Sequence, residues 1–346
     1  MGDAAEGIRR SGGGVGRVLG SPRGLLLVSA LAVGGVLGSG LVLPHLLLWS
    51  PLPVEWRRGP EAGEVTVFAH RGGVVLPGAG ENSLAALRAA IARGYHGVEV
   101  DVRETADGAL IAQHDAGFER THGAACERAG FLACPSRDYG ACAEEARRAG
   151  VRRCHVADMT LREVCLLSET GGGEKVPTLD EYLEVAGRAG MEVMLDFKQA
   201  LTPGAVRRLE RMLEAHLPDG PVYLIGKTDP KLALVRRHGY GRFGVPRSVH
   251  PVAYVVGKLA ARGQPFVFQN GVTTRREDLA YASVLGVEII PTLNWHHLGR
   301  GASDVERERL IAAAHRELER LYGLGVRKFQ IDSDFDGVFF DPGPGG

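Results

Sequence analysis

The chain has 346 residues, of which 45% are hydrophobic and 24% are charged, and these proportions are those of a folded globular protein. Its 41 Lys and Arg residues balance 41 Asp and Glu residues. A net charge of zero argues against the strongly basic surface with which proteins bind a phosphate backbone, so we expect no nucleic-acid partner.

The first predicted element is a membrane-spanning helix over residues 24–49. No Asp, Glu, Lys or Arg occurs between Gly24 and Val54, and the apolar run exceeds the roughly 20 residues that a bilayer requires. Four arginines precede it, so the positive-inside rule predicts a cytoplasmic tail over 1–23 and a lumenal or extracellular remainder. We therefore predict a single-pass membrane protein with this segment as its signal anchor. A cleaved signal peptide is the alternative interpretation.

Strands and helices alternate along residues 64–340. A parallel α/β sheet is built from such alternation, and about eight repeats favour a closed (β/α)8 barrel, the TIM barrel. Apolar runs predict strands at 65–70, 97–102, 109–114, 191–198, 221–226, 265–270, 286–293 and 326–332, with 243–246 as a competing strand. Helical patterns occupy 83–93, 178–189, 203–216 and 303–322, and the first of them has Asn82 or Ser83 as its N-cap.

Segment 122–155 interrupts the alternation and is predicted to be a loop insertion in the barrel. It contains Cys126, Cys134, Cys142 and Cys154. Two disulfides are expected in a translocated domain, and three pairings are possible. Cys165 lies in an apolar helical pattern, and we expect it to be a buried free thiol.

Polar side chains gather where the first four predicted strands end. Residues i and i+2 of a strand point to the same face, so Glu99 shares a face with Asp101, and Asp196 shares one with Lys198. Carboxylates that converge at one end of a barrel require a neutralising cation, and oxygen ligands indicate Mg²⁺ or Ca²⁺. His70, Arg71 and His114 also follow strands in this way.

Three further motifs carry weaker signals. Residues 220–228 resemble a P-loop but have five residues between the glycines instead of four, so we expect no nucleotide. Asp332, Asp334 and Asp336 begin like a calcium loop without its final Glu, and we interpret them as a solvated acidic turn. Trp295 follows the seventh predicted strand, where the substrate loops of a barrel lie, and is a candidate to stack on a lipid headgroup.

Several segments together resemble the glycerophosphodiester phosphodiesterase family. They are FAHRGG (68–73), the run 81–115, VADMTLREV (156–164), VPTLDEYLEVA (176–186), MLDFK (194–198) and GVRKFQID (325–332). The resemblance implies a (β/α)8 barrel, catalytic histidines at His70 and His114, and a phosphate-contacting Arg71. It further implies metal ligands at Glu99, Asp101 and Asp196, with Glu81 near the metal and substrate.

The implied reaction is metal-dependent hydrolysis of a glycerophosphodiester to sn-glycerol 3-phosphate and an alcohol. One histidine would act as general base and the other as general acid, while the cation, Arg71 and Lys198 would offset charge on the phosphate. The sequence Asp196-Phe197-Lys198 departs from the family's Glu-x-Lys and resembles sphingomyelinase D barrels. A lysophospholipase D or sphingomyelinase D-like enzyme acting on membrane lipids is therefore the alternative, and an inert barrel serving as a receptor is a third hypothesis.

Overall fold

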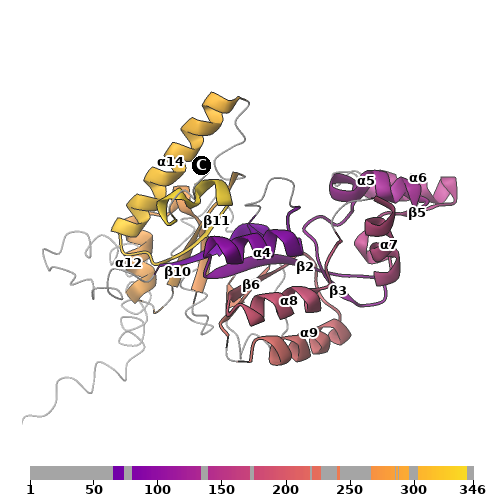
Figure 1. Ribbon diagram of the computed structural model, residues 1–346, viewed down its shortest axis with the longest axis horizontal. Helices are drawn as coiled ribbons and strands as arrows, with labels where there is room; N and C mark the ends of the chain where they lie inside the picture. Colours follow the sequence, from indigo (N-terminus) through magenta and orange to yellow (C-terminus); the bar gives the residue numbers. More distant parts are fainter. Residues whose placement is uncertain are drawn as a thin grey trace, which may run out of the picture. The chain divides into compact units, whose positions relative to one another are not determined.

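The computed structural model describes residues 65–73, 80–133, 139–171, 175–218, 220–226, 240–241, 266–284, 286, 288–295 and 303–340 (Figure 1). The predicted membrane span 24–49 and the tail before it lie outside these residues. Within the described ranges, no helix combines the length and the apolar character needed to cross a bilayer.

In the described part of the chain, eight parallel strands form one curled sheet. Their order is β8-β7-β6-β2-β1-β11-β10-β9, and each neighbouring pair along this path is parallel. The end strands β8 and β9 contact one another, so the sheet curls round into a barrel-like arrangement. The strands are β1 (Thr66–Ala69), β2 (Gly97–Glu104), β6 (Glu192–Phe197), β7 (Val222–Gly226), β8 (Tyr240–Gly241), β9 (Phe266–Asn270), β10 (Glu288–Leu293) and β11 (Lys328–Ile331).

Helices connect these strands, as the alternation predicts. They are α4 (Leu84–Arg93), α8 (Leu179–Arg188), α9 (Pro203–His216), α12 (Arg276–Val284) and α14 (Asp304–Gly323), with 3-10 turns η1 (His70–Gly72), η3 (Gly271–Thr273) and η4 (Ser333–Val338). Ser83 is the N-cap of α4 and accepts a hydrogen bond from the amide of Ala86 (3.1 Å). The local patterns predicted α4, α8, α9 and α14 to within one residue at their ends, whereas α12 was not among the predicted helices.

The strand predicted at 109–114 is not a strand of the barrel. It forms β3 (Leu110–Ala112), which pairs antiparallel with β2. A parallel pairing needs a crossover of a dozen or more residues, whereas only residues 105–109 separate the two strands, so they form a hairpin. The eighth parallel strand is β8, and the competing strand predicted at 243–246 lies outside the described residues.

The cysteine-containing insertion is a small helical unit and not an irregular loop. It consists of α5 (Glu119–Arg128), β4 (Phe131–Leu132), α6 (Tyr139–Ala149), β5 (Arg152–Arg153), η2 (Val156–Asp158) and α7 (Leu161–Gly171), and β4 pairs parallel with β5. Figure 1 shows α5, α6 and α7 together beyond β2 and β3. Phe118, Met159 and Leu167 are fully buried in its own apolar cluster. The unit therefore begins before residue 122 and continues past 155.

One disulfide of the insertion joins Cys126 to Cys154. Cys142 is also disulfide-bonded, and Cys134 lies outside the described residues. Cys165 is a free thiol, as predicted, but it is only half-buried because it lies between buried Val164 and exposed Leu166 on α7.

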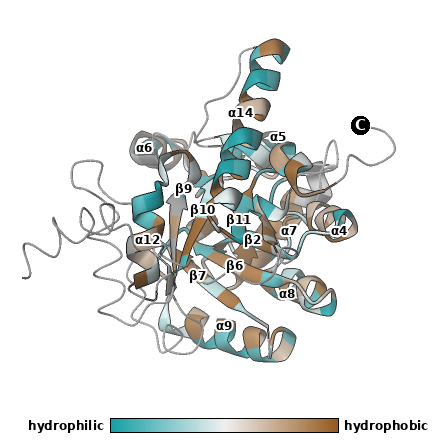
Figure 2. Cartoon of the chain, turned by 90° about the vertical axis from the view of Figure 1, so that its left-hand side faces the viewer, coloured by the Kyte–Doolittle hydropathy of each residue, from teal (hydrophilic) through white to brown (hydrophobic). Residues whose placement is uncertain are grey.

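Period-2 alternation along the strands separates an apolar face from a functional face. On β2, Val98, Val100 and Val102 are fully buried in the main core, which also includes side chains of the helices that cover the sheet. Figure 2 shows the central strands largely brown, whereas α8, α9 and α12 mix brown and teal, as expected for helices with one buried face. Glu99 and Asp101 lie on the opposite face of β2. A second apolar cluster, which includes Phe68 and Met194, holds the strands together on that side.

Candidate active site

A left-handed turn follows β1 and carries His70 and Arg71. Arg71 (φ 53°) and Asn82 (φ 59°) are the non-glycine residues with positive φ in the described part of the chain, and the amide of Asn82 donates to the carbonyl of Arg71 (2.8 Å). Such backbone strain persists only where neighbouring contacts hold it. Here the Arg71 amide donates to Glu99 Oε2 (2.8 Å), so the turn is attached directly to the functional face of β2.

Three carboxylates meet on neighbouring strands. Asp101 of β2 lies in register with Asp196 of β6, and Glu99 precedes Asp101 on the same face. One oxygen from each of Glu99, Asp101 and Asp196 lies within 4.8 Å of the other two. Asn82 fixes Asp101 from both sides, because its Nδ2 donates to Asp101 Oδ2 (2.8 Å) and its Oδ1 accepts from the Asp101 amide (3.0 Å). The predicted metal ligands are thus brought together.

The electrostatics of this cluster fit a bound cation. Burial, and then the negative charge of Asp101, raise the pKa of Glu99 well above its usual range. Burial acts in the same direction on Asp101, but the charges of Lys198 and Arg71 outweigh it and hold the pKa of Asp101 below its usual range. The negative charge of Asp101 disfavours the ionised form of Glu99, and a cation bound to both carboxylates would offset this repulsion. Oxygen donors of this kind match the preference of Mg²⁺ and Ca²⁺.

Lys198 and Arg71 lie against the carboxylates. Lys198 Nζ is 2.8 Å from Asp101 Oδ1 and 2.5 Å from Asp196 Oδ2. Arg71 Nη1 donates to Glu81 Oε2 (3.0 Å), and its Nε lies 3.5 Å from Asp101 Oδ2. Both predicted phosphate-binding cations and Glu81 therefore belong to one network with the carboxylate cluster.

His70 is oriented by a residue from the last strand. Its Nδ1 lies 2.6 Å from Asp332 Oδ1, and the other oxygen of Asp332 accepts from the amide of Trp295 (2.7 Å). Burial lowers the pKa of His70, but the hydrogen bond and the charge of Asp332 outweigh burial, so the pKa is raised overall. A carboxylate can only accept from the ring, so Nδ1 carries the proton and Nε2 is left toward Glu99, 3.9 Å away.

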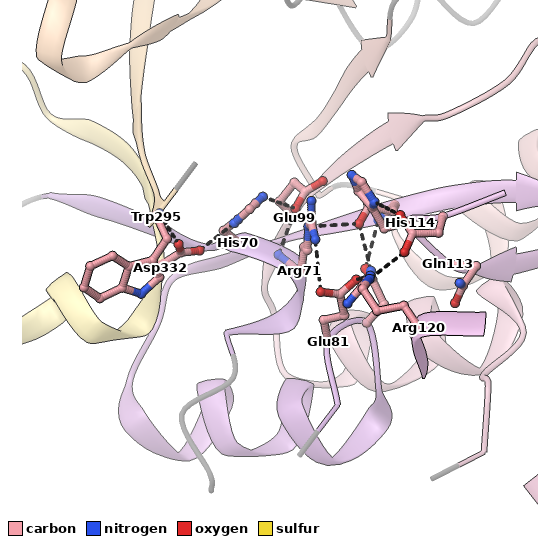
Figure 3. Close-up of polar contacts among 12 residues, drawn as sticks. His70, Arg71, Glu81, Glu99, Gln113, His114, Arg120, Trp295 and Asp332 are labelled. Atoms are coloured by element: carbon pink, nitrogen blue, oxygen red, sulfur yellow. Dashed lines mark hydrogen bonds and ion pairs between the residues drawn. The ribbon is translucent and has the colours of Figure 1, made fainter. Parts of the chain in front are cut away.

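His114 has the same kind of support from its neighbour in sequence. Its Nδ1 lies 2.8 Å from Asp115 Oδ1, and the side chain of Arg103 donates twice to its carbonyl (3.0 and 2.8 Å). The hydrogen bond to His114 holds the pKa of Asp115 well below its usual range, assisted by Arg120. In the view of Figure 3, His70 and His114 lie on either side of Arg71 and Glu99.

Two acidic residues of the η4 region are not solvated, contrary to the expectation for this turn. Asp332 bonds His70, and Asp336 accepts from Arg93 Nε and Nη2 (3.1 and 3.0 Å) and from Tyr95 Oη (3.2 Å). The interpretation was wrong because it considered only the local loop pattern, whereas the partners come from distant parts of the chain. The position of Asp332 directly after the last strand was the available signal.

Trp295 lies next to this turn, at the end of β10. Its Nε1 donates to Asp334 (2.6 Å), and its ring packs against Phe335 with centroids 4.9 Å apart. The guanidinium of Arg307 lies over the same ring, 5.0 Å from its centroid. The residue is thus tied to the His70 side of the site through Asp332, while its role as a headgroup platform stays a prediction.

Arg120 joins the two sides of the site and was not predicted from the sequence. It comes from α5 of the insertion, and its guanidinium forms ion pairs with Glu81 and Asp115. Its position shortly after His114 and Asp115 was the only local signal.

Residues 70–221 match the model of the "Glycerophosphoryl diester phosphodiesterase family". Glycerophosphodiester phosphodiesterase 1 of Bos taurus is 39% identical over 101 residues, which are 28% of this chain and 30% of the bovine protein. The chain thus matches only about a third of the length of that relative. The glycerophosphodiester phosphodiesterase of Caldanaerobacter subterraneus is 28% identical over 265 residues, covering 65% of this chain and 93% of that protein.

Solved structures with the same fold include a phosphodiesterase of Oleispira antarctica in complex with the product sn-glycerol-3-phosphate. It is 18% identical, has a TM-score of 0.54, and covers 80% of this chain and 96% of its own. At this level of identity the similarity shows the fold, which agrees with the curled parallel sheet described above.

Proposed function

We propose that this chain is a member of the glycerophosphodiester phosphodiesterase family and hydrolyses glycerophosphodiesters to sn-glycerol 3-phosphate and an alcohol. One observation carries the proposal: two histidines, each oriented through Nδ1 by a carboxylate, flank a cluster of three carboxylates. Hydrolysis of a phosphodiester needs this combination, because it requires a base, an acid and stabilisation of negative charge.

In this proposal His70 and His114 transfer the protons. Each donates Nδ1–H to its carboxylate, at 2.6 Å for Asp332 and 2.8 Å for Asp115, so Nε2 is the nitrogen available to the substrate. A neutral ring accepts a proton there from the attacking hydroxyl or water, and a protonated ring gives one to the leaving alcohol. Because the two supports are alike, either histidine can serve as the base or as the acid.

Arg71 and Lys198 would bind the phosphate, and Glu99, Asp101 and Asp196 would hold one divalent cation, Mg²⁺ or Ca²⁺. The cation, when bound, would stabilise negative charge on the phosphoryl oxygens. The two protein cations are held close to the carboxylate cluster, with Arg71 also bonded to Glu81. Their positive charges therefore lie at the proposed phosphate-binding site before the substrate binds.

A lipid substrate is the second candidate. The carboxylate on β6 is Asp196, one methylene shorter than the glutamate typical of the family, which is the feature shared with sphingomyelinase D barrels. This favours a lysophospholipase D or sphingomyelinase D-like activity as the alternative.

We also propose that residues 24–49 anchor the chain in a membrane, with the barrel on the lumenal or extracellular side. The charge-free run and the arginines before it support this orientation, and the Cys126–Cys154 disulfide is compatible with an oxidising compartment. Protease treatment of sealed vesicles tests it: the barrel should be protected when the cytoplasmic face is exposed, and its digestion from that face would contradict the proposal.

Product analysis of the full chain by phosphorus NMR tests the activity. Glycerophosphocholine, glycerophosphoinositol, lysophosphatidylcholine and sphingomyelin are each incubated with the protein and Mg²⁺ or Ca²⁺. Release of sn-glycerol 3-phosphate is expected, and EDTA should abolish it. Products from the lipids alone, as lysophosphatidate or a cyclic phosphate, would favour the second candidate.

Two variants complete this test. His70→Ala and His114→Ala should each lose turnover by roughly 10²–10⁴-fold, the usual contribution of a general acid or base. No turnover of any substrate by the unmodified, metal-loaded chain would favour the inert barrel. Appreciable activity of either histidine variant would remove that residue from the mechanism.

A further inference from the structure

Arg120 contacts both sides of the active site from the insertion. Its Nη2 lies 2.5 Å from Glu81 Oε1, and its Nε lies 2.6 Å from Asp115 Oδ2. Glu81 precedes α4, and Asp115 follows β3, so the two carboxylates come from separate loops of the barrel. A single planar guanidinium therefore joins these loops directly, in addition to the contacts that Asn82 and Gln113 make with Asp101 of β2.

The second oxygen of each carboxylate contacts a residue of the proposed mechanism. Glu81 Oε2 accepts from Arg71 Nη1 at 3.0 Å, and Asp115 Oδ1 lies 2.8 Å from His114 Nδ1. The contacts thus run without a gap from Arg71 through Glu81, Arg120 and Asp115 to His114, as the dashed lines of Figure 3 show. Cationic and anionic groups alternate along this path.

We propose that Arg120 is a positioning residue that holds the phosphate-binding Arg71 and the proton-transferring His114 in a fixed mutual geometry. The inference rests on the proposed function. Without Arg120, Glu81 and Asp115 would be two like charges without their shared partner, and each would be free to turn away from the residue it orients. Arg71 and His114 would then lose the constraint that keeps them in productive positions.

The solvent exposure of the Arg120 side chain distinguishes a positioning role from a contribution to the free energy of folding. The side chain of Arg120 is 46% exposed, whereas those of Glu81 and Asp115 are 18% and 14% exposed. Ion pairs of a half-exposed side chain add little to the free energy of folding. The two-sided, planar geometry is the property that only an arginine supplies, so its replacement should affect turnover far more than unfolding.

The insertion fixes where Arg120 lies. Phe118, fully buried in the insertion's apolar cluster, donates its amide to the carbonyl of Cys154 (3.2 Å), and Cys154 is joined to Cys126 of α5. The start of α5 is thus held at Phe118, and Cys126 holds the helix further along. The disulfide-closed insertion is therefore expected to act on the active site through Arg120.

The test compares Arg120→Ala, Arg120→Lys and the control Arg152→Ala in the full chain. Arg152 belongs to the same insertion, is 52% exposed and pairs with one carboxylate, that of Glu163. For Arg120→Ala we expect kcat to fall by roughly 10–100-fold, as for other residues that orient functional groups, with unchanged metal affinity and midpoint of thermal unfolding. Arg120→Lys should recover part of the loss, added methylguanidinium should partly restore Arg120→Ala, and the control should keep wild-type kcat.

Wild-type kcat in Arg120→Ala, or an equal loss in Arg152→Ala, would overturn the proposal. A double-mutant cycle combines Arg120→Ala with removal of the disulfide by Cys126→Ser/Cys154→Ser. The two changes should be strongly non-additive, because opening the insertion has no further effect on kcat once Arg120 is absent. Additive losses would show that the insertion does not act through Arg120.

A measurement independent of turnover distinguishes failure of this inference from failure of the proposed function. Ring nitrogen NMR signals of His114 report the hydrogen bond to Asp115, and they should change in Arg120→Ala but not in Arg152→Ala. If the unmodified chain hydrolyses no phosphodiester, the proposed function fails while this signal still tests Arg120. If the chain is active and neither the signal nor kcat responds, only the inference fails.

Discussion

The two carboxylate oxygens of Asp332 contact different partners, and this arrangement determines the tautomer and the pKa of His70. One oxygen binds the imidazole at 2.6 Å and the other accepts from the Trp295 amide, so the carboxylate cannot rotate freely. Both side chains are largely buried, with 17% of His70 and 19% of Asp332 exposed. The charge of the carboxylate is therefore poorly screened by solvent, which explains its influence on the ring.

The pair predicts a pH-dependent stability. Burial opposes the charged form of both groups, but their mutual interaction raises the pKa of His70 and lowers that of Asp332. Because the pKa of His70 is raised, its interaction stabilises the fold fully below the unfolded value of about 6.5, and this stabilisation is lost as pH rises through the folded pKa. Because the pKa of Asp332 is lowered, its interaction stabilises the fold above the unfolded value of about 3.9, and this stabilisation is lost as pH falls through the folded pKa. Asp332→Asn should therefore destabilise the protein most between these two values.

Urea unfolding across this pH range measures the effect, together with an NMR titration of His70, whose pKa should fall in the variant. Asp180→Asn is the matched control, because Asp180 forms a His–Asp pair with His216 (2.9 Å) and is 57% exposed. The control should change stability little at any pH. A constant difference between Asp332→Asn and wild type at all pH values would contradict the coupling.

Asp196 provides a second prediction at this scale. Asp196→Ala should weaken Mg²⁺ or Ca²⁺ binding by more than about tenfold, because it removes one of the three proposed carboxylate ligands, whereas Asp196→Glu should keep most of the affinity. Isothermal titration calorimetry on metal-free protein measures both. Equal affinities of Asp196→Ala and wild type would place the cation elsewhere.

At the scale of elements, the contact among β1, β2 and β6 positions the proposed metal ligands. Gly97 begins β2 and lies in register with Phe68 on one side and Glu192 on the other. A Cβ atom at Gly97 would lie 2.4 Å from the Phe68 ring and 2.9 Å from the Glu192 carbonyl. The absence of a side chain there lets the three strands approach, and the same registers bring Asp101 beside Asp196.

Gly97→Ala is therefore expected to lower the free energy of unfolding by about 1–3 kcal/mol, the usual cost of overpacking a core. Gly140→Ala in α6 is the control, since a Cβ atom there meets no atom within 4 Å. That substitution in a helix should be neutral or stabilising by up to about 1 kcal/mol. Chemical denaturation of both variants measures the contrast, and identical midpoints would show that packing at Gly97 does not limit stability.

At the scale of the whole molecule, a curled sheet carries the proposed catalytic groups and a separately packed insertion supplies Arg120. The insertion has its own apolar cluster, distinct from the main core of the sheet and its helices. The disulfide joins residues with a sequence separation of 28 and thus closes most of this unit. Local opening of the insertion can therefore occur without unfolding of the sheet.

Cys126→Ala/Cys154→Ala should destabilise the insertion by about 2–4 kcal/mol. Hydrogen exchange followed by mass spectrometry is expected to show lost protection in α5 and α7, with protection of β1, β2 and β6 retained. Cys165→Ala, which removes a free thiol, is the control and should leave both regions protected. Equal loss of protection in the sheet would mean that the two units unfold together.

The sequence by itself determined four helices and most of the strands, because periodicity and capping act over a few residues, but it did not predict α12 or the insertion helices α5, α6 and α7. It also determined that Glu99 and Asp101 share a face, since they are two apart on one strand, and its motifs resemble those of the glycerophosphodiester phosphodiesterase family, whose model matches residues 70–221. The tertiary structure decided which strands are neighbours, and it placed Asp101 in register with Asp196, whose convergence the resemblance had only implied. It also decided that His70 meets Asp332, 262 residues away, and that Arg120 reaches Glu81, 39 residues away. Such contacts depend on the packing of the whole chain, which no local pattern encodes.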